Sequence, residues 1–170
     1  LTGLLGDGLV SRVHSAVPTG AEAGKEYFLK VARQPRYNDL MAREFRMLKK
    51  VRATSANAQR ETFFAIHRSY MPEPMLSFVI AGEAHTLRTA NLMNVSSNPH
   101  LTAVALKNLF PDGLPLTHVY WIFRRLLLTV WMAHLRGVAH GGVTPDHLLI
   151  YPDRIGGATG HGHGLVLVDW

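Results

Sequence analysis

The residues best suited to chemistry gather near the end of this 170-residue sequence, in residues 140–150, His-Gly-Gly-Val-Thr-Pro-Asp-His-Leu-Leu-Ile. This segment holds two histidines, His140 and His147, and one acid, Asp146. A second acid, Asp169, follows an apolar run a little further on. Imidazole and carboxylate groups can move protons or hold a metal ion. Such groups commonly act from loops that rigid elements hold in place, so we expect this segment to join a helix to a strand.

Hydrophobic spacing predicts the elements on either side of this segment. Apolar residues recur every three to four positions from Thr117, a candidate N-cap, to about residue 136, which predicts a helix. They cover more than one face, so we expect this helix to be buried on several sides. Gly137 is suited to end it. Residues 148–151 and 165–168 are short apolar runs typical of buried strands. Before the long helix, residues 91–99 are polar and typical of a loop, and residues 101–109 predict a short helix.

The N-terminal third offers groups that could bind phosphate. Residues 4–16 alternate apolar and polar types around Gly6 and Gly8, which predicts a two-stranded hairpin. Glycines let a backbone approach phosphate closely and present N–H groups to it, although a plain hairpin turn is the commoner meaning of two such glycines.

A lysine and a glutamate follow in the next two predicted elements. Residues 26–31 predict a strand in which Lys30 either contacts phosphate or faces water from a sheet edge. Residues 37–52 predict an amphipathic helix with Glu44 in its middle, as a partner of Lys30 or of neighbouring surface arginines.

In this order the motifs resemble the catalytic core of the protein-kinase-like superfamily. That family has a Gly-rich hairpin, a strand with a lysine, a helix with a glutamate, a His-Arg-Asp loop and an Asp-Phe-Gly metal motif. Kinases of the aminoglycoside phosphotransferase type have His-Gly-Asp in the loop, which His140-Gly141 resembles. Asp169-Trp170 is similar to Asp-Phe.

The resemblance implies an α+β, bilobal protein-kinase-like fold. Its N-lobe, residues 1–80, would hold a five-stranded antiparallel sheet and one main helix, with residues 62–70 and 75–80 as the last two strands. Residues 81–84 would be the hinge. Residues 85–170 would be a truncated, mostly helical C-lobe that ends at the Asp-Phe-Gly-like position. We also expect that the natural polypeptide continues past residue 170 and that its start has been trimmed.

The resemblance further implies an ATP pocket and a Mg or Mn ion. Asp169 would hold the metal. The hinge backbone would contact the adenine edge, and Lys30 would contact the phosphates. The residues that the resemblance assigns to nucleotide binding are Gly6, Gly8, Val13, Lys30, Glu44 and Ala81.

Two positions depart from the family pattern and alter its chemistry. Gly142 stands where the catalytic aspartate belongs, and glycine has no group that could accept a proton. His147 stands where the metal-binding asparagine belongs, and imidazole is a poor ligand for magnesium, so it is a weak second metal ligand beside Asp169. Asp146 is the remaining candidate base, and that role would require a rearranged loop.

We therefore predict a pseudokinase: a regulatory or scaffolding module, without phosphotransferase activity, that binds other proteins and has a retained nucleotide pocket. An active atypical kinase that uses Asp146 is one alternative. A basic polyanion- or nucleic-acid-binding domain is another, because the net charge is +6 and the pI is near 10.0. The basic residues are spread along the chain without interleaved aromatic residues, which favours ordinary solvated surfaces.

Composition limits the remaining classes. Hydrophobic residues make up 47% of the chain, which argues for a packed core rather than disorder. Without cysteine there is no disulfide or thiol chemistry, and without a long apolar run there is no predicted membrane segment, so we expect a cytoplasmic protein. His161 and His163 lie in a Gly-rich stretch that is a linker or, with His140 or His147, a zinc or nickel site.

Overall fold

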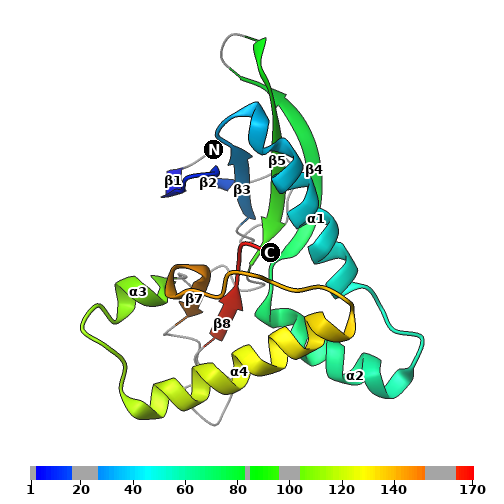
Figure 1. Cartoon of the computed structure of the whole chain (residues 1–170), viewed down its shortest axis with the longest axis vertical. Helices are drawn as coiled ribbons and strands as arrows, with labels where there is room; N and C mark the ends of the chain where they lie inside the picture. The colour runs from blue at the N-terminus through cyan, green and yellow to red at the C-terminus, as the bar shows by residue number, and fades with distance from the viewer. Residues whose placement is uncertain (1–2, 17–26, 83–84, 96–103, 152–163) are drawn as a thin grey trace. The chain divides into compact units, whose positions relative to one another are not determined.

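A computed structural model of the chain describes residues 3–16, 27–82, 85–95, 104–151 and 164–170 (Figure 1). The fold is α+β, as predicted. Two compact units divide the chain: the first comprises Leu1–Lys49 and Glu73–Pro99, and the second comprises Lys50–Pro72 and His100–Trp170. Within the described residues, no helix is both long and apolar enough to cross a membrane.

The first unit is built on a five-stranded antiparallel sheet in the order β1-β2-β3-β5-β4. The predicted hairpin is confirmed by β1 and β2, and the predicted lysine strand is confirmed by β3, which lies at the centre of the sheet. The strands are β1 (Gly3–Asp7), β2 (Ser11–Ala16), β3 (Tyr27–Ala32), β4 (Glu73–Ala81) and β5 (Leu87–Asn94).

One long helix, α1 (Asn38–Arg52), packs on this sheet and confirms the predicted amphipathic helix (Figure 1). A 3-10 turn, Pro35–Tyr37, leads into it, and proline is well suited to such a start. Met41 and Leu48, on the apolar face of this helix, are buried. Polar contacts fix it to β5: the Asn91 side chain donates to the Met41 carbonyl at 2.8 Å, and the Thr89 amide donates to the Asn38 side chain at 2.7 Å.

The predicted strand over residues 62–70 is wrong. Those residues continue α2 (Ala58–His67) and the 3-10 turn Arg68–Tyr70. The Asn57 side chain caps α2 by accepting a hydrogen bond from the Arg60 amide at 2.9 Å. Phe64 and His67, three residues apart, bury one face of the helix.

The fifth strand is instead β5, in a segment that was predicted to be partly a loop. It forms a hairpin with β4, and Ala81 at the end of β4 pairs with Leu87. The boundary predicted at residues 81–84 therefore falls within a hairpin of the first sheet, and residues 83–84 lie outside the described residues. The units differ from the predicted lobes in a second way, because residues 50–72 belong with the C-terminal part.

The second unit combines a three-stranded sheet, in the order β6-β7-β8, with α2 and two further helices. Both predicted C-terminal strands are confirmed. Their apolar side chains form a core with Leu106 and Ile122, and α4 runs beneath β7 and β8 in the view of Figure 1. The elements are β6 (Val104–Ala105), α3 (Leu106–Leu109), α4 (Leu116–Leu135), a 3-10 turn (Pro145–His147), β7 (Leu148–Tyr151) and β8 (Gly164–Leu167).

Helix α4 confirms the predicted end but not the predicted start or burial. Gly137 adopts a φ of +64°, and its amide donates to His134 while that of Val138 donates to Ala133, the paired bonds typical of a helix stop. At the start, Pro115 rather than Thr117 is the N-cap.

The burial of α4 is confined to one face. The buried residues are Ile122, Thr129, Met132 and Ala133. More than half of the surface of Tyr120, Phe123 and Trp131 is exposed, so burial on several sides is wrong for the described residues. Of the short helix predicted at residues 101–109, Leu106–Leu109 forms α3, whereas residues 101–103 lie outside the described part.

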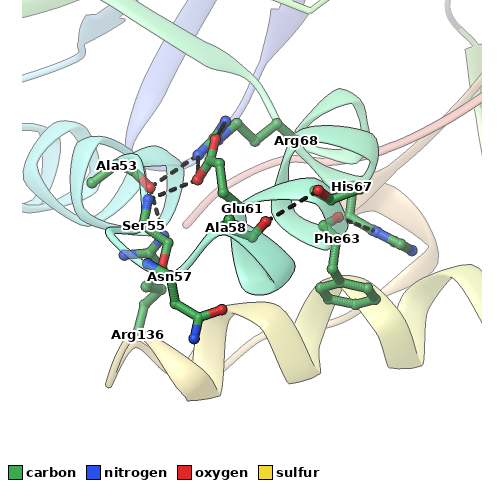
Figure 2. A network of polar contacts seen from close by, with 10 residues as sticks. Ala53, Ser55, Asn57, Ala58, Glu61, Phe63, His67, Arg68 and Arg136 are labelled. Atoms are coloured by element: carbon green, nitrogen blue, oxygen red, sulfur yellow. Dashed lines mark hydrogen bonds and ion pairs between the residues drawn. The ribbon is translucent and has the colours of Figure 1, made fainter.

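A polar network joins the start of α2 to its end (Figure 2). The Arg68 guanidinium donates to both oxygens of Glu61, at 2.6 and 2.9 Å, and the Ser55 amide donates to Glu61 at 2.7 Å. Arg68 and Arg136 both donate to the Ala53 carbonyl, at 3.1 and 2.6 Å. Three donors thus converge on one carboxylate, mainly Arg68 and then Ser55, and they lower the pKa of Glu61 below its ordinary value of 4.5.

This lowered pKa makes part of the stability depend on pH. A carboxyl whose pKa is lower in the folded state than in the unfolded state stabilises the fold above its unfolded pKa, and this contribution is lost as the pH falls through the folded pKa. We expect Glu61→Gln to lower the melting temperature at pH 7 and to change it much less near pH 3. Circular dichroism melts at both pH values measure this difference. The exposed Asp112→Asn is the matched control, and an equal effect of Glu61→Gln at both pH values would contradict the expectation.

Candidate functional site

The candidate residues fall on both units. Gly6, Gly8, Val13, Lys30, Glu44 and Ala81 belong to the first unit, and Asp146, His147 and Asp169 belong to the second.

The turn between β1 and β2 is held by hydrogen bonds on both sides of Gly8. Its amide donates to the Ser11 carbonyl at 3.0 Å, and its carbonyl accepts from the Arg33 guanidinium at 2.9 Å. A Cβ atom on Gly8 would lie 3.3 Å from the Ser11 oxygen, which is a tight contact, whereas one on Gly6 would meet only an ordinary contact with Val13. Packing therefore favours a glycine at Gly8, whereas Gly6 has room for a side chain. Sequence reasoning missed Arg33, which no motif marks.

Strand pairing places Val13, Lys30 and Asn91 side by side across β2, β3 and β5. Residues directly opposite each other in a sheet point to the same face. That face is the one that α1 covers, because Asn91 donates to the Met41 carbonyl of α1. Lys30 is therefore on a central strand and points beneath a helix, which excludes the alternative of an edge lysine that faces water.

Lys30 and Glu44 form the predicted pair. The Lys30 Nζ atom lies 2.8 Å from Glu44 Oε1, and the two side chains are only 9% and 6% exposed. Glu44 is thus not a surface partner of its helical neighbours. Two buried charges cost desolvation free energy, which their mutual attraction and hydrogen bond offset only when the geometry is good.

In the second unit, His140 links the polar loop to the segment after β8. The Gly142 amide donates to His140 Nδ1 at 3.3 Å, so in the neutral ring the proton is on Nε2, which donates to the Val168 carbonyl at 2.8 Å. The His140 ring also meets Trp170 edge to face, with centroids 4.8 Å apart. His140 therefore contacts the residues on both sides of Asp169: the Val168 backbone and the Trp170 side chain.

His147 lies between the loop and Asp169. Its Nδ1 atom is 2.5 Å from the Gly142 carbonyl oxygen, and its Nε2 atom is 3.4 Å from Asp169 Oδ2. The Val168 amide donates to the His147 carbonyl at 2.9 Å, which fixes the two backbones to each other. The structure thus brings together the two residues predicted as metal ligands.

Asp146, the candidate base, points elsewhere. Its carboxylate is 60% exposed and lies 3.2 Å from the Lys107 ammonium. It lies at a surface hollow that is also lined by Asn108, Phe110 and Pro145.

The remaining predicted site residues are Ala81, His161 and His163. Ala81 closes the β4–β5 hairpin, and its adenine contact stays a prediction. His161 and His163 lie outside the described residues. Among the residues that the structure describes, no group of three or more histidine, aspartate or glutamate side chains could hold a metal ion. Any metal here would therefore need water or ligand oxygens to complete its coordination.

No model of a known protein family matches the chain, and no curated protein sequence is similar to it.

The buried pair yields a stability prediction. Lys30→Met or Glu44→Leu alone leaves one buried charge without its partner, which typically costs about 3–5 kcal/mol of the free energy of unfolding. The double variant removes both charges and should be much closer to the parent protein. Urea unfolding of the four proteins gives the coupling energy. If each single variant costs no more than about 1 kcal/mol, the value for an exposed pair, the two groups are not buried together.

Proposed function

We propose that the chain is a protein-kinase-like module without efficient phosphotransfer, a pseudokinase that keeps a nucleotide pocket and acts through contacts with other proteins. The observation that carries this proposal is the buried Lys30–Glu44 ion pair on the central strand of the first sheet. A buried ion pair is weak evidence for stability, since apolar residues often serve a core as well. A function would explain the pair: Glu44 would hold the Lys30 ammonium in position to contact the phosphates of a nucleotide.

Other features of the first unit support a nucleotide pocket. The tight turn at Gly8 precedes the lysine strand, as the Gly-rich hairpin does in the resemblance. Val13 lies directly opposite Lys30 on the neighbouring strand, on the same face of the sheet. We propose that the first unit corresponds to an N-lobe and the second to part of a C-lobe.

The loss of catalysis follows from the loop in the second unit. Gly142 offers only backbone atoms, and its carbonyl is already bonded to His147. Asp146 is paired with Lys107 at the surface. Loss of a general base typically lowers a rate by about 10²–10⁴-fold. What this chain can still do is bind and orient: Lys30 would neutralise phosphate charge, and Asp169 with His147 would hold a metal ion.

Calorimetry tests the nucleotide pocket. We expect the chain to bind ATP, and we expect the doubly substituted Lys30→Met/Glu44→Leu protein, which leaves no unpaired buried charge, to lose that binding at least tenfold. The double variant Asp39→Ala/Lys49→Ala is the matched control, because it likewise removes one carboxylate and one ammonium, here from exposed positions of α1, and leaves the net charge unchanged. Equal ATP affinity in all three proteins would mean that any binding is non-specific attraction to the basic surface, and would contradict the proposed pocket.

A radiolabel assay tests the absence of catalysis. With labelled ATP and either Mg²⁺ or Mn²⁺, we expect phosphate transfer to protein substrates to stay at the level of an Asp169→Asn variant. Transfer that clearly exceeds this background and disappears on Asp146→Asn would favour an active atypical kinase that uses Asp146 as its base.

A further inference from the structure

Strand β4 forms one edge of the first sheet (Figure 1). Alternate residues of a strand face opposite sides, so Val79 lies on one face and Leu76 and Phe78 lie on the other. Leu76 and Val79 are each 59% exposed, and Phe78 is 41% exposed. From Pro74 to Ala81 the strand has no charged residue. A long, uncharged edge strand with exposed apolar side chains is a surface that pairs readily with another strand.

The opposite edge of the sheet is protected against such pairing. Strand β1 has five residues, against nine in β4, and its register with β2 is irregular. It ends at Asp7, whose carboxylate is paired with Arg12 and Arg33 at 3.2 and 3.4 Å. Short length, bulges and charges are the features by which natural sheets block pairing at an edge. In β4 such features are confined to its first residues, 73–75.

The hairpin of β4 and β5 shows which backbone groups of β4 are already used. The Gly82 amide donates to the Thr86 carbonyl at 2.6 Å, so these two residues are a hydrogen-bonded pair. Bonded and non-bonded pairs alternate along an antiparallel ladder. Phe78 and Ile80, an even number of residues before Gly82, therefore direct their N–H and C=O groups to β5.

The residues between them direct their backbone groups outward. The Thr89 amide, opposite Val79, accordingly turns away from β4 and donates to the Asn38 side chain at 2.7 Å. The N–H and C=O groups of Ser77, Val79 and Ala81 thus face the outer edge of the sheet. Among the described residues, no strand pairs with this side of β4.

A second copy of β4 is the partner that suits this edge. The partner strand must be uncharged and apolar on both faces, as β4 itself is. Ordering the backbone of a flexible segment costs about 1–2 kcal/mol per residue, whereas β5 already holds β4 extended. Antiparallel pairing of two identical strands about a two-fold axis is also self-complementary.

One register uses all three outward residues. With the two-fold axis at Val79, this residue lies opposite its own copy, and Ser77 lies opposite Ala81 of the second copy. On the other face, the same register sets Phe78 opposite Ile80 of the second copy, which buries both side chains further. We propose that the chain forms a two-fold dimer through β4, in which the two first-unit sheets become one continuous sheet. This dimer does not depend on nucleotide binding.

Analytical ultracentrifugation of the whole chain, over a range of concentrations and without nucleotide, tests the dimer. We expect a dimer that dissociates on dilution. Val79→Lys sets two ammonium groups opposite each other at the axis and should weaken association about tenfold or more, and Val79→Glu should do the same with two carboxylates. An equal mixture of the two variants should associate again, because each lysine then faces a glutamate. Circular dichroism melts check that both variants fold.

A control variant and hydrogen exchange locate the contact. Leu127→Lys, which puts the same charge on the exposed apolar face of α4 in the second unit, should leave the association unchanged. In the dimer, the outward amides of Ser77 and Val79 should exchange more slowly than in the monomer. The amides of Phe78 and Ile80, which face β5, should exchange alike in both.

Three results would overturn the proposal. They are a chain that stays monomeric at every concentration, a dimer that Leu127→Lys disrupts and Val79→Lys leaves intact, and a mixture of the two Val79 variants that does not associate. The first result would leave the β4 edge to an extended segment of another protein. Since no nucleotide is present, none of these results bears on ATP binding, and failure of ATP binding leaves the dimer standing.

Discussion

The ion pair between Lys30 and Glu44 is the constraint on which the first unit depends. Lys30 is on the central strand, so its ammonium has strands on both sides and a helix above it. The attraction of Glu44 offsets the cost of burying this charge, and placing Glu44 opposite Lys30 constrains the rotation of α1 about its axis. The polar contacts of Asn91 with Met41 and of Thr89 with Asn38 then hold the same helix at the same rotation. An apolar stripe alone would leave that rotation less well defined.

The spacing of hydrophobic residues was sufficient to predict those helices and strands whose residues also have the matching secondary-structure propensity. The helix over residues 37–52, the strand with Lys30 and the stop at Gly137 all follow from spacing and backbone preference. Prediction from spacing failed where the propensity of the residues differs from the secondary structure that they adopt. Residues 62–66, Thr-Phe-Phe-Ala-Ile, favour a strand by propensity, yet the cap at Asn57 and the Glu61–Arg68 pair stabilise a helix there. In this segment the cap and the ion pair outweigh the strand propensity of the residues.

The opposite error occurred at β5. Asn91 and Asn94 are typical of loops, so a strand was not expected there. Asn91 is completely buried because its side chain bonds to α1 and accepts from Ser77, and both partners are distant in sequence. The same limit applies to the candidate site. The sequence indicated Lys30, Glu44, His147 and Asp169 through a resemblance, but neither the direction of the His147 ring nor the role of His140 follows from spacing. Those depend on backbone carbonyls, which every residue has and no sequence pattern marks.

In the polar loop of the second unit, the backbone of Gly142 contributes a contact although this residue has no side chain. A Cβ atom on Gly142 would lie 3.8 Å from the His147 ring, an ordinary contact, and Gly142 does not need a left-handed backbone. Sterics therefore do not require glycine at this position. What the loop uses is the Gly142 carbonyl, which fixes the ring of His147 and thereby aims its second nitrogen at Asp169. The positions Gly142 and His147 are therefore linked structurally: a backbone carbonyl, which any residue at position 142 would supply, sets the direction of the His147 ring.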